Sequence, residues 1–141
     1  MEVKYMSLLK QIRAEQSVKT FFQNEWDDEK HWIHCQCVVD ACLGMIKNTD
    51  LDPVVFILAG WLHDLGKIID KENHHKESIK FVTKFINQYP EYKDYLSLIE
   101  DCIINHRSEG VPASVYAHIF QLADKVAVSN HDWIEYKKKK R

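Results

Sequence analysis

Apolar residues recur along the chain at steps of three and four, the spacing that places them on one face of an α-helix. Two such stripes come first, and the polar run Asp27-Asp28-Glu29 separates them. The first stripe comprises Leu8, Leu9, Ile12, Val18, Phe21 and Phe22. The second predicts a helix from about His31 to Ile46, with Lys47-Asn48 as its C-terminal stop signal.

The segment after residue 51 predicts a central, buried helix. Asp52 can cap its N-terminus, and Pro53 suits the first helical position, where no backbone N–H is needed. The following VVFILAGWLHDLG is apolar on nearly all sides, which is typical of a helix enclosed by others. We expect this helix to end at Gly66, because glycine readily adopts the left-handed conformation that follows a helix.

Three further helices are predicted in the second half of the chain. Asn73 can cap a helix from about His74 to Gln88, Pro90 opens the next, and Pro112 opens the one after it. The four glycines and three prolines are too few for a strand-rich fold with many turns. We therefore expect a single all-α domain over residues 1–141, a helical bundle of about six or seven helices.

Composition narrows the classes of function. A net charge of -2 and a pI near 6.4 argue against a protein built to bind nucleic acid or an anionic membrane. The basic run from Lys137 to Arg141 is the exception, and such a run at a terminus is usually solvated. The longest apolar stretch, Val54 to Leu62, is far short of the roughly 20 residues of a membrane span, and the N-terminus lacks a signal-peptide pattern. We expect a cytoplasmic protein with reduced cysteines and no membrane partner.

The four cysteines do not form a zinc-site pattern. Cys35 and Cys37 stand beside His34, but residues two apart point to different sides of a helix. Cys42 and Cys102 form no CxxC pair. We interpret all four as small buried thiols.

Two ionisable residues end the apolar central helix, the adjacent pair His63-Asp64. Burying them is costly unless they are paired or bound to a metal, and a histidine–aspartate hydrogen bond alone could account for the pair. His34 and Asp124 favour a shared explanation, because each lies in another apolar helix. A divalent cation offsets the desolvation of all four groups, and two imidazoles with two carboxylates suit manganese, iron, cobalt or magnesium.

The order His34, His63-Asp64, Asp124 resembles the H…HD…D signature of the HD-domain metal-dependent phosphohydrolase superfamily, here as a small stand-alone protein. The agreement extends to the neighbours Val38, Leu62, Leu65, Gly66, Lys67, Ala123 and Lys125. The resemblance covers a metal-site core of about residues 30–128. It implies a metal held between helices and a metal-activated water that hydrolyses a phosphate ester or anhydride. The implied partner is a small phosphorylated substrate, often a nucleotide.

The resemblance also points to two further histidines. His74 and His106 stand where branches of the superfamily with a second metal, or with extra substrate contacts, carry histidines; His75 competes with His74 for this position. If both bind metal, Asp64 would bridge two ions. If instead they are exposed histidines at helix ends, the centre holds one ion.

Two basic residues are candidates for contacting phosphate. Lys67 matches the family's HDxGK pattern and could neutralise phosphate charge, while Asp64 could orient the attacking water. Arg107 is a second candidate, because a guanidinium binds phosphate oxygens bidentately. The remaining histidines with no supporting context, His31, His118 and His131, are interpreted as structural or surface residues.

Two other functions stay open. Some relatives use a di-iron centre for oxidation, which would require His74 and His106 as ligands. A non-catalytic helical module that binds a nucleotide would usually have lost a ligand, whereas this chain keeps all four. A homo-oligomer is also open, because the aromatic residues Phe21, Phe22 and Trp26 could cover either their own core or a neighbour.

Overall fold

The computed structural model describes residues 2–139, and side chains from residue 5 onward within that range. These residues form seven α-helices and two 3₁₀ helices, with no strand among them, which confirms the all-α prediction. The α-helices are α1 (Glu2–Glu25), α2 (Glu29–Met45), α3 (Pro53–Leu62), α4 (His74–Gln88), α5 (Leu96–Ile104), α6 (Val115–Ala127) and α7 (His131–Lys139). The 3₁₀ helices are η1 (Leu65–Ile68) and η2 (Pro90–Tyr95).

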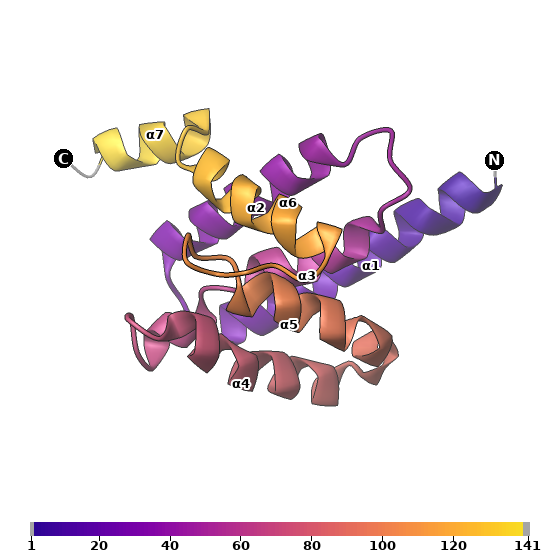
Figure 1. Ribbon diagram of the computed structural model, residues 1–141, viewed down its shortest axis with the longest axis horizontal. Coiled ribbons are helices and arrows are strands. Elements are labelled where there is room, and N and C mark those ends of the chain that lie inside the picture. Colours follow the sequence, from indigo (N-terminus) through magenta and orange to yellow (C-terminus); the bar gives the residue numbers. More distant parts are fainter. Residues whose placement is uncertain (1, 140–141) are drawn as a thin grey trace.

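The helix α3 lies at the centre of the bundle, between α4 and α5 on one side and α2 and α6 on the other (Figure 1). Nine of its ten residues are buried, as its apolar sequence predicts. The predicted cap is present, because the Asp52 carboxylate accepts a hydrogen bond from the N–H of Val54 at 3.0 Å and Pro53 occupies the first turn. The central helix therefore places its C-terminal His63 and Asp64 among the other helices.

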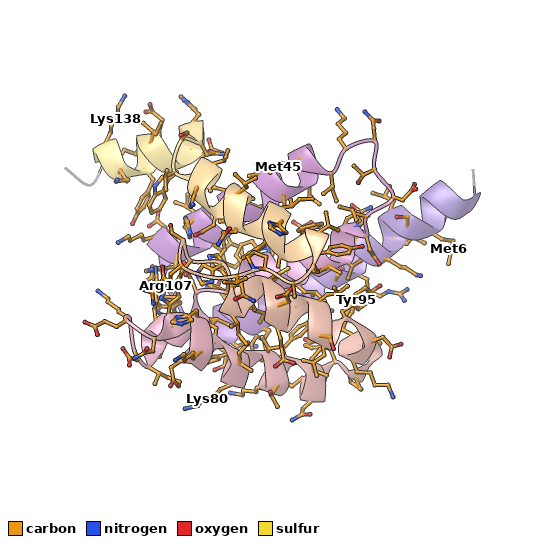
Figure 2. All side chains as sticks on the ribbon, in the orientation of Figure 1. Met6, Met45, Lys80, Tyr95, Arg107 and Lys138 are labelled. Carbon is orange, nitrogen blue, oxygen red and sulfur yellow. The ribbon has the colours of Figure 1, made fainter. Side chains whose placement is uncertain are left out.

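The first helix is buried along only half of its length. Phe21 and Phe22 lie in the core of their own chain, whereas Leu8, Leu9 and Ile12 are exposed. The cause is length: α1 has 24 residues and α3, which it covers, has ten, so the first turns of α1 extend past the bundle (Figure 1). The labelled Met6 lies near this free end (Figure 2). The apolar stripe is therefore part of one helix, as expected, but only its second half is buried.

Several helix boundaries differ from the predicted ones. The central helix ends at Leu62 rather than Gly66, which lies inside η1 and has no positive φ. Pro90 opens η2, and α5 begins only at Leu96. The last long helix begins after Ser114, whose hydroxyl accepts from the N–H of Ala117, rather than at Pro112.

Two further details concern the helix ends. Asn73 directly precedes α4, but its side chain bonds to Asp70 and does not cap the helix. The segment His131–Lys139 forms a further helix, α7, and the lysines of the basic run that the structure describes, Lys137, Lys138 and Lys139, are exposed. Lys140 and Arg141 lie outside the described residues. Among residues 2–139, no helix combines the length and the apolar character of a membrane span.

Candidate metal centre

The structure brings the six residues that were predicted as metal ligands to one place, where five segments of the chain meet. They are His34 in α2, His63 and Asp64 at the end of α3, His74 at the start of α4, His106 after α5, and Asp124 in α6. The six come from positions up to 90 residues apart in the sequence. The bundle therefore converges on this cluster, although whether it binds metal stays a prediction.

The first half of the cluster contains two imidazoles and two carboxylates. The Nε2 atom of His34 lies 3.2 Å from Oδ1 of Asp124 and 3.6 Å from Oδ2 of Asp64. The Nε2 atom of His63 lies 3.4 Å from an Oδ1 of each of the same two carboxylates. Donor atoms of His34, His63 and Asp64 lie within 4.8 Å of one another, close enough to share one cation.

The second half consists of Asp64, His74 and His106. Donor atoms of these three residues also lie within 4.8 Å of one another, so Asp64 belongs to both halves. The Nε2 atoms of His74 and His106 are 3.0 Å apart, and Nε2 of His74 is 3.5 Å from Oδ1 of Asp64. His75 instead contacts Arg107, so His74 and not His75 lies in the cluster. His106 is 3% exposed, so it is not the exposed helix-end histidine of the alternative interpretation.

Three of the imidazoles are oriented by the backbone. The Nδ1 atoms of His63, His74 and His106 lie 2.7, 2.8 and 2.5 Å from the carbonyl oxygens of Gly60, Lys71 and Ile103, each three residues earlier. Because a carbonyl oxygen only accepts, each Nδ1 carries the proton and donates it. In the neutral ring, Nε2 then presents a lone pair to the cluster, which is the arrangement that orients a metal-binding histidine.

Polar atoms are buried at the cluster without hydrogen-bond partners. His63 is 0% exposed and Asp64 is 2% exposed. Among the described residues, neither Nε2 of His63 nor Oδ2 of Asp64 has a hydrogen-bond partner. A buried acceptor without a partner is costly, and a cation removes that cost for nitrogen and oxygen together. The donor set, mixed imidazole and carboxylate, fits a divalent transition metal.

The charges of the cluster follow from its burial and its neighbours. Burial opposes ionisation of Asp64, yet the charges of His63 and Lys67 hold its pKa well below the usual range. For Asp124, burial is likewise outweighed by the hydrogen bond from His34 and by the nearby charge of His63, and its pKa is also lowered. Burial lowers the pKa of His106 to about 4, and the charge of His63 acts in the same direction. The cluster thus holds two ionised carboxylates and a neutral His106 at neutral pH.

A close approach of two segments explains the glycine of the HDxGK pattern. A Cβ on Gly66 would lie 2.2 Å from the carbonyl oxygen of His74 and 2.5 Å from the amide nitrogen of Ser78. Only a residue without a side chain lets the first turn of α4 approach η1 this closely. Gly66 was expected at a helix end, and its close approach to α4 was not predicted. Ser78 is completely buried at this contact.

The two candidate phosphate-binding residues lie differently. Lys67 is half-buried, and its Nζ lies 3.5 Å from Oδ1 of Asp64. Arg107 donates to the carbonyl oxygen of Glu72, lies 3.2 Å from Nδ1 of His75, and forms an ion pair with Glu109. Arg107 therefore fastens the segment after α5 to the start of α4, at the edge of the molecule (Figure 2). A phosphate contact by either residue stays a prediction.

The remaining cysteines and histidines agree with their structural interpretation. All four cysteines are buried and free, and within residues 2–139 none belongs to either group of metal-donor atoms. Burial raises the pKa of the Cys35 thiol to about 11, so it stays protonated. His31 stacks on Trp26 with ring centroids 4.2 Å apart, and His118 is exposed.

Comparisons with known proteins place the cluster in a wider context. A family model described as HD domain matches residues 32–129, from the first turn of α2 to just beyond α6. Ribonuclease Y from Malacoplasma penetrans (strain HF-2) is 26% identical over 100 residues, which cover 69% of this chain and 20% of ribonuclease Y. The chain therefore corresponds to about a fifth of that relative's length. No solved structure matches the chain at a comparable level of similarity.

Proposed function

The chain belongs to the HD domain family, and from that premise we propose that it is a metal-dependent phosphohydrolase with two divalent ions in its centre. The substrate we propose is a phosphate ester or anhydride, with nucleotides as the leading class. A single observation carries the proposal of a second ion. It is the approach of His74 and His106, whose Nε2 atoms face each other at 3.0 Å.

These two nitrogens cannot satisfy each other. Each ring already donates its Nδ1 proton to a backbone carbonyl, so both Nε2 atoms are acceptors. Sharing one more proton would create a charged imidazolium at a buried position, which is costly. A divalent cation accepts both lone pairs and is itself balanced by the carboxylate of Asp64, which lies 3.5 Å from His74.

The two ions we propose share one ligand. His34, His63, Asp64 and Asp124 would hold the first, and Asp64, His74 and His106 the second. Such a pair, when bound, lowers the pKa of a water and polarises a phosphoryl oxygen. Asp64 would also orient that water. Lys67, whose Nζ is 3.5 Å from the same carboxylate, would neutralise charge on the phosphate.

The nucleotide class is supported by the relative rather than by a base-reading feature of this chain. Ribonuclease Y, by its name, acts on RNA, whose linkages are phosphodiesters. A nucleotide phosphate is therefore the substrate we expect to be hydrolysed first in a screen. Location in the cytoplasm and assembly into a homo-oligomer stay predictions.

The test combines metal analysis with a substrate screen. Protein stripped with a chelator is reloaded with manganese, iron, cobalt or magnesium, and bound metal is counted per chain. We expect two ions in the natural sequence, one in His106→Gln, and none in Asp64→Ala. Hydrolysis of bis(p-nitrophenyl) phosphate, nucleoside mono-, di- and triphosphates and a short oligoribonucleotide should follow the metal content. Hydrolysis that survives replacement of both His63 and Asp64 would rule the mechanism out.

A matched control separates the centre from other histidines. His118 lies in the same helix as Asp124 but is exposed, so His118→Gln should keep both ions and the full rate of hydrolysis. Loss of metal from His118→Gln would show that replacing a histidine outside the centre is enough to release metal, so loss of metal from the other variants would not identify ligands.

The same histidine pair also favours a second candidate, a di-iron oxidase. That function requires His74 and His106 as ligands, and both face the cluster. It predicts that protein loaded with ferrous iron consumes oxygen and gains visible absorption on exposure to air. Colourless protein that hydrolyses phosphate with manganese would exclude this candidate.

A further inference from the structure

One imidazole of the centre lacks the support that the other three have. His63, His74 and His106 each donate Nδ1–H to a backbone carbonyl, whereas the buried Nδ1 of His34 has no hydrogen-bond partner among the described residues. A histidine without such a bond is free to rotate about its side-chain torsions unless its ring is held by packing. Apart from the contact of its Nε2 with Asp124 at 3.2 Å, the orientation of the His34 ring therefore depends on packing.

The indole of Trp133 supplies such packing. Its ring centroid lies 5.4 Å from that of His34, with an interplanar angle of 57°. Trp133 is 8% exposed, although it belongs to the most C-terminal helix, whose other described residues are all exposed or half-buried. Within α7, the ring of Tyr136 stacks on the indole at 6.0 Å, and Nζ of Lys137 lies 5.9 Å from its centroid. The indole is thus fixed between α7 and the metal-facing residue of α2.

The rest of α7 is anchored on the same helix. The main packing partner of α7 is α2, which carries His34, and the backbone N–H of Trp133 interacts with the sulfur of Cys37. Cys37 lies three residues after His34, on the next turn of that helix. The match to the HD domain model ends at residue 129, before α7 begins. The indole contact is therefore supplied by a segment beyond the matched domain.

We propose that Trp133 is a positioning residue for the metal centre, and that α7 acts as a clamp which holds His34 in its metal-binding orientation. This inference rests on the proposed function, because it assumes that His34 binds a cation. Rotation of the His34 ring would separate it from the indole and leave an apolar gap beside α2. The aromatic contact thus does for His34 what a carbonyl oxygen does for the other three histidines.

The test measures Mn²⁺ affinity at each half of the centre separately. In His106→Gln the half with His34 remains, and in His34→Gln the half with His74 and His106 remains. Trp133→Leu is then added to each of these two variants, because leucine keeps an apolar side chain at this position but lacks the aromatic ring. Loss of an outer contact to a metal-binding histidine weakens metal affinity by about 10- to 100-fold. We expect a loss of that size in the His106→Gln background and an unchanged affinity in the His34→Gln background.

Two variants distinguish positioning from general stability. Trp26→Leu removes another tryptophan that stacks on a histidine, His31, at 4.2 Å, and should leave Mn²⁺ affinity unchanged in both backgrounds. Trp133→Phe keeps an aromatic ring and should restore most of the affinity that Trp133→Leu loses. Should Trp133→Leu fail to fold, Trp133→Phe supplies the comparison, with a loss smaller than tenfold confined to the His106→Gln background.

The outcomes separate this inference from the proposed function. If His106→Gln binds no Mn²⁺ at all, the proposal of a first ion is wrong, and the proposed role of Trp133 is wrong as well because it depends on that ion. If that variant binds Mn²⁺ and Trp133→Leu leaves its affinity unchanged, the clamp is wrong while the proposed function stands. An equal loss of affinity in both backgrounds would also overturn the clamp, because it would show a general effect on folding.

Discussion

The hydroxyl of Ser78 donates a hydrogen bond to the backbone carbonyl of His63 at 2.7 Å and accepts one from the N–H of Gly66 at 2.8 Å. The side chain therefore bridges both ends of the turn that carries His63 and Asp64. Ser78 stands one helical turn after His74 in α4. One turn of α4 thus supplies His74 to the second half of the centre and fixes the backbone on either side of Asp64, which both halves share.

Replacing this hydroxyl should destabilise the protein. Ser78→Ala leaves a buried carbonyl and a buried amide without a partner, which costs about 1–3 kcal/mol. The measurement is urea unfolding in the presence of a chelator, so that metal binding does not contribute. Thr83→Ala, at an exposed position of the same helix, is the control and should change stability by less than about 0.5 kcal/mol. Equal stabilities of the two variants would show that the bridge is dispensable.

Two glycines should respond oppositely to the same substitution. A Cβ on Gly66 meets backbone atoms of α4 at 2.2 and 2.5 Å, so Gly66→Ala must move η1 away from α4 and should cost at least about 1–3 kcal/mol. A Cβ on Gly44, in α2, meets nothing within 4 Å. Gly44→Ala should therefore stabilise the protein by up to about 1 kcal/mol through helix propensity. Thermal unfolding of both variants tests the pair, and a tolerated Gly66→Ala would contradict the close approach.

Helix boundaries could be predicted from the sequence where the residues that determine them lie at the boundary itself. Asp52 and Pro53 define the start of α3 by capping and by backbone geometry, and both act within a few residues. The end of α3 could not be found in this way, because Gly66 is needed for contact with a helix that begins eight residues later. The exposed start of α1 was missed for a similar reason: the pattern of Leu8 and Ile12 carries no information about the length of the helix beneath.

In the candidate centre, too, some residues could be predicted from the local sequence and one depends on how distant segments pack. His34, His63, Asp64 and Asp124 could be predicted because a charged group in an apolar helix needs a partner, and the structure brings them together. Trp133 could not, because its role depends on α7 folding back onto α2. A lone tryptophan before a basic run carries no such signal.

Removing metal should lower stability by an amount set by affinity. A ligand that binds the folded state alone stabilises it by about 2.7 kcal/mol at a free concentration of 100 times its Kd. Thermal unfolding with Mn²⁺ and with chelator should therefore differ by several degrees in the natural sequence, and less in His74→Gln. In Asp64→Asn the difference should vanish, since both proposed ions use this carboxylate. A shift that persists there would place the metal elsewhere.

Acid should weaken the segment that leads from His106 to α6, through Asp101. This carboxylate accepts hydrogen bonds from the Ser114 hydroxyl at 2.6 Å, from the N–H of Ala113 and from the side chain of Asn105. Burial opposes its ionisation, but the bonds to Ser114, Ala113 and Asn105 outweigh burial and lower the pKa of Asp101. A carboxyl whose pKa is lower in the folded state stabilises the fold above its unfolded pKa of about 3.9, and this stability is lost as the pH falls through the folded pKa.

Asp101→Asn should therefore cost about 1–3 kcal/mol at neutral pH, because an amide places a donor against donors. The gap between the natural sequence and the variant should stay constant down to about pH 4 and narrow below it, as the natural carboxyl becomes protonated. Urea unfolding in chelator across this range measures the gap, with Asp50→Asn at an exposed position as the control. A gap that does not change with pH would show that the carboxylate charge contributes nothing to holding Ser114 and the start of α6.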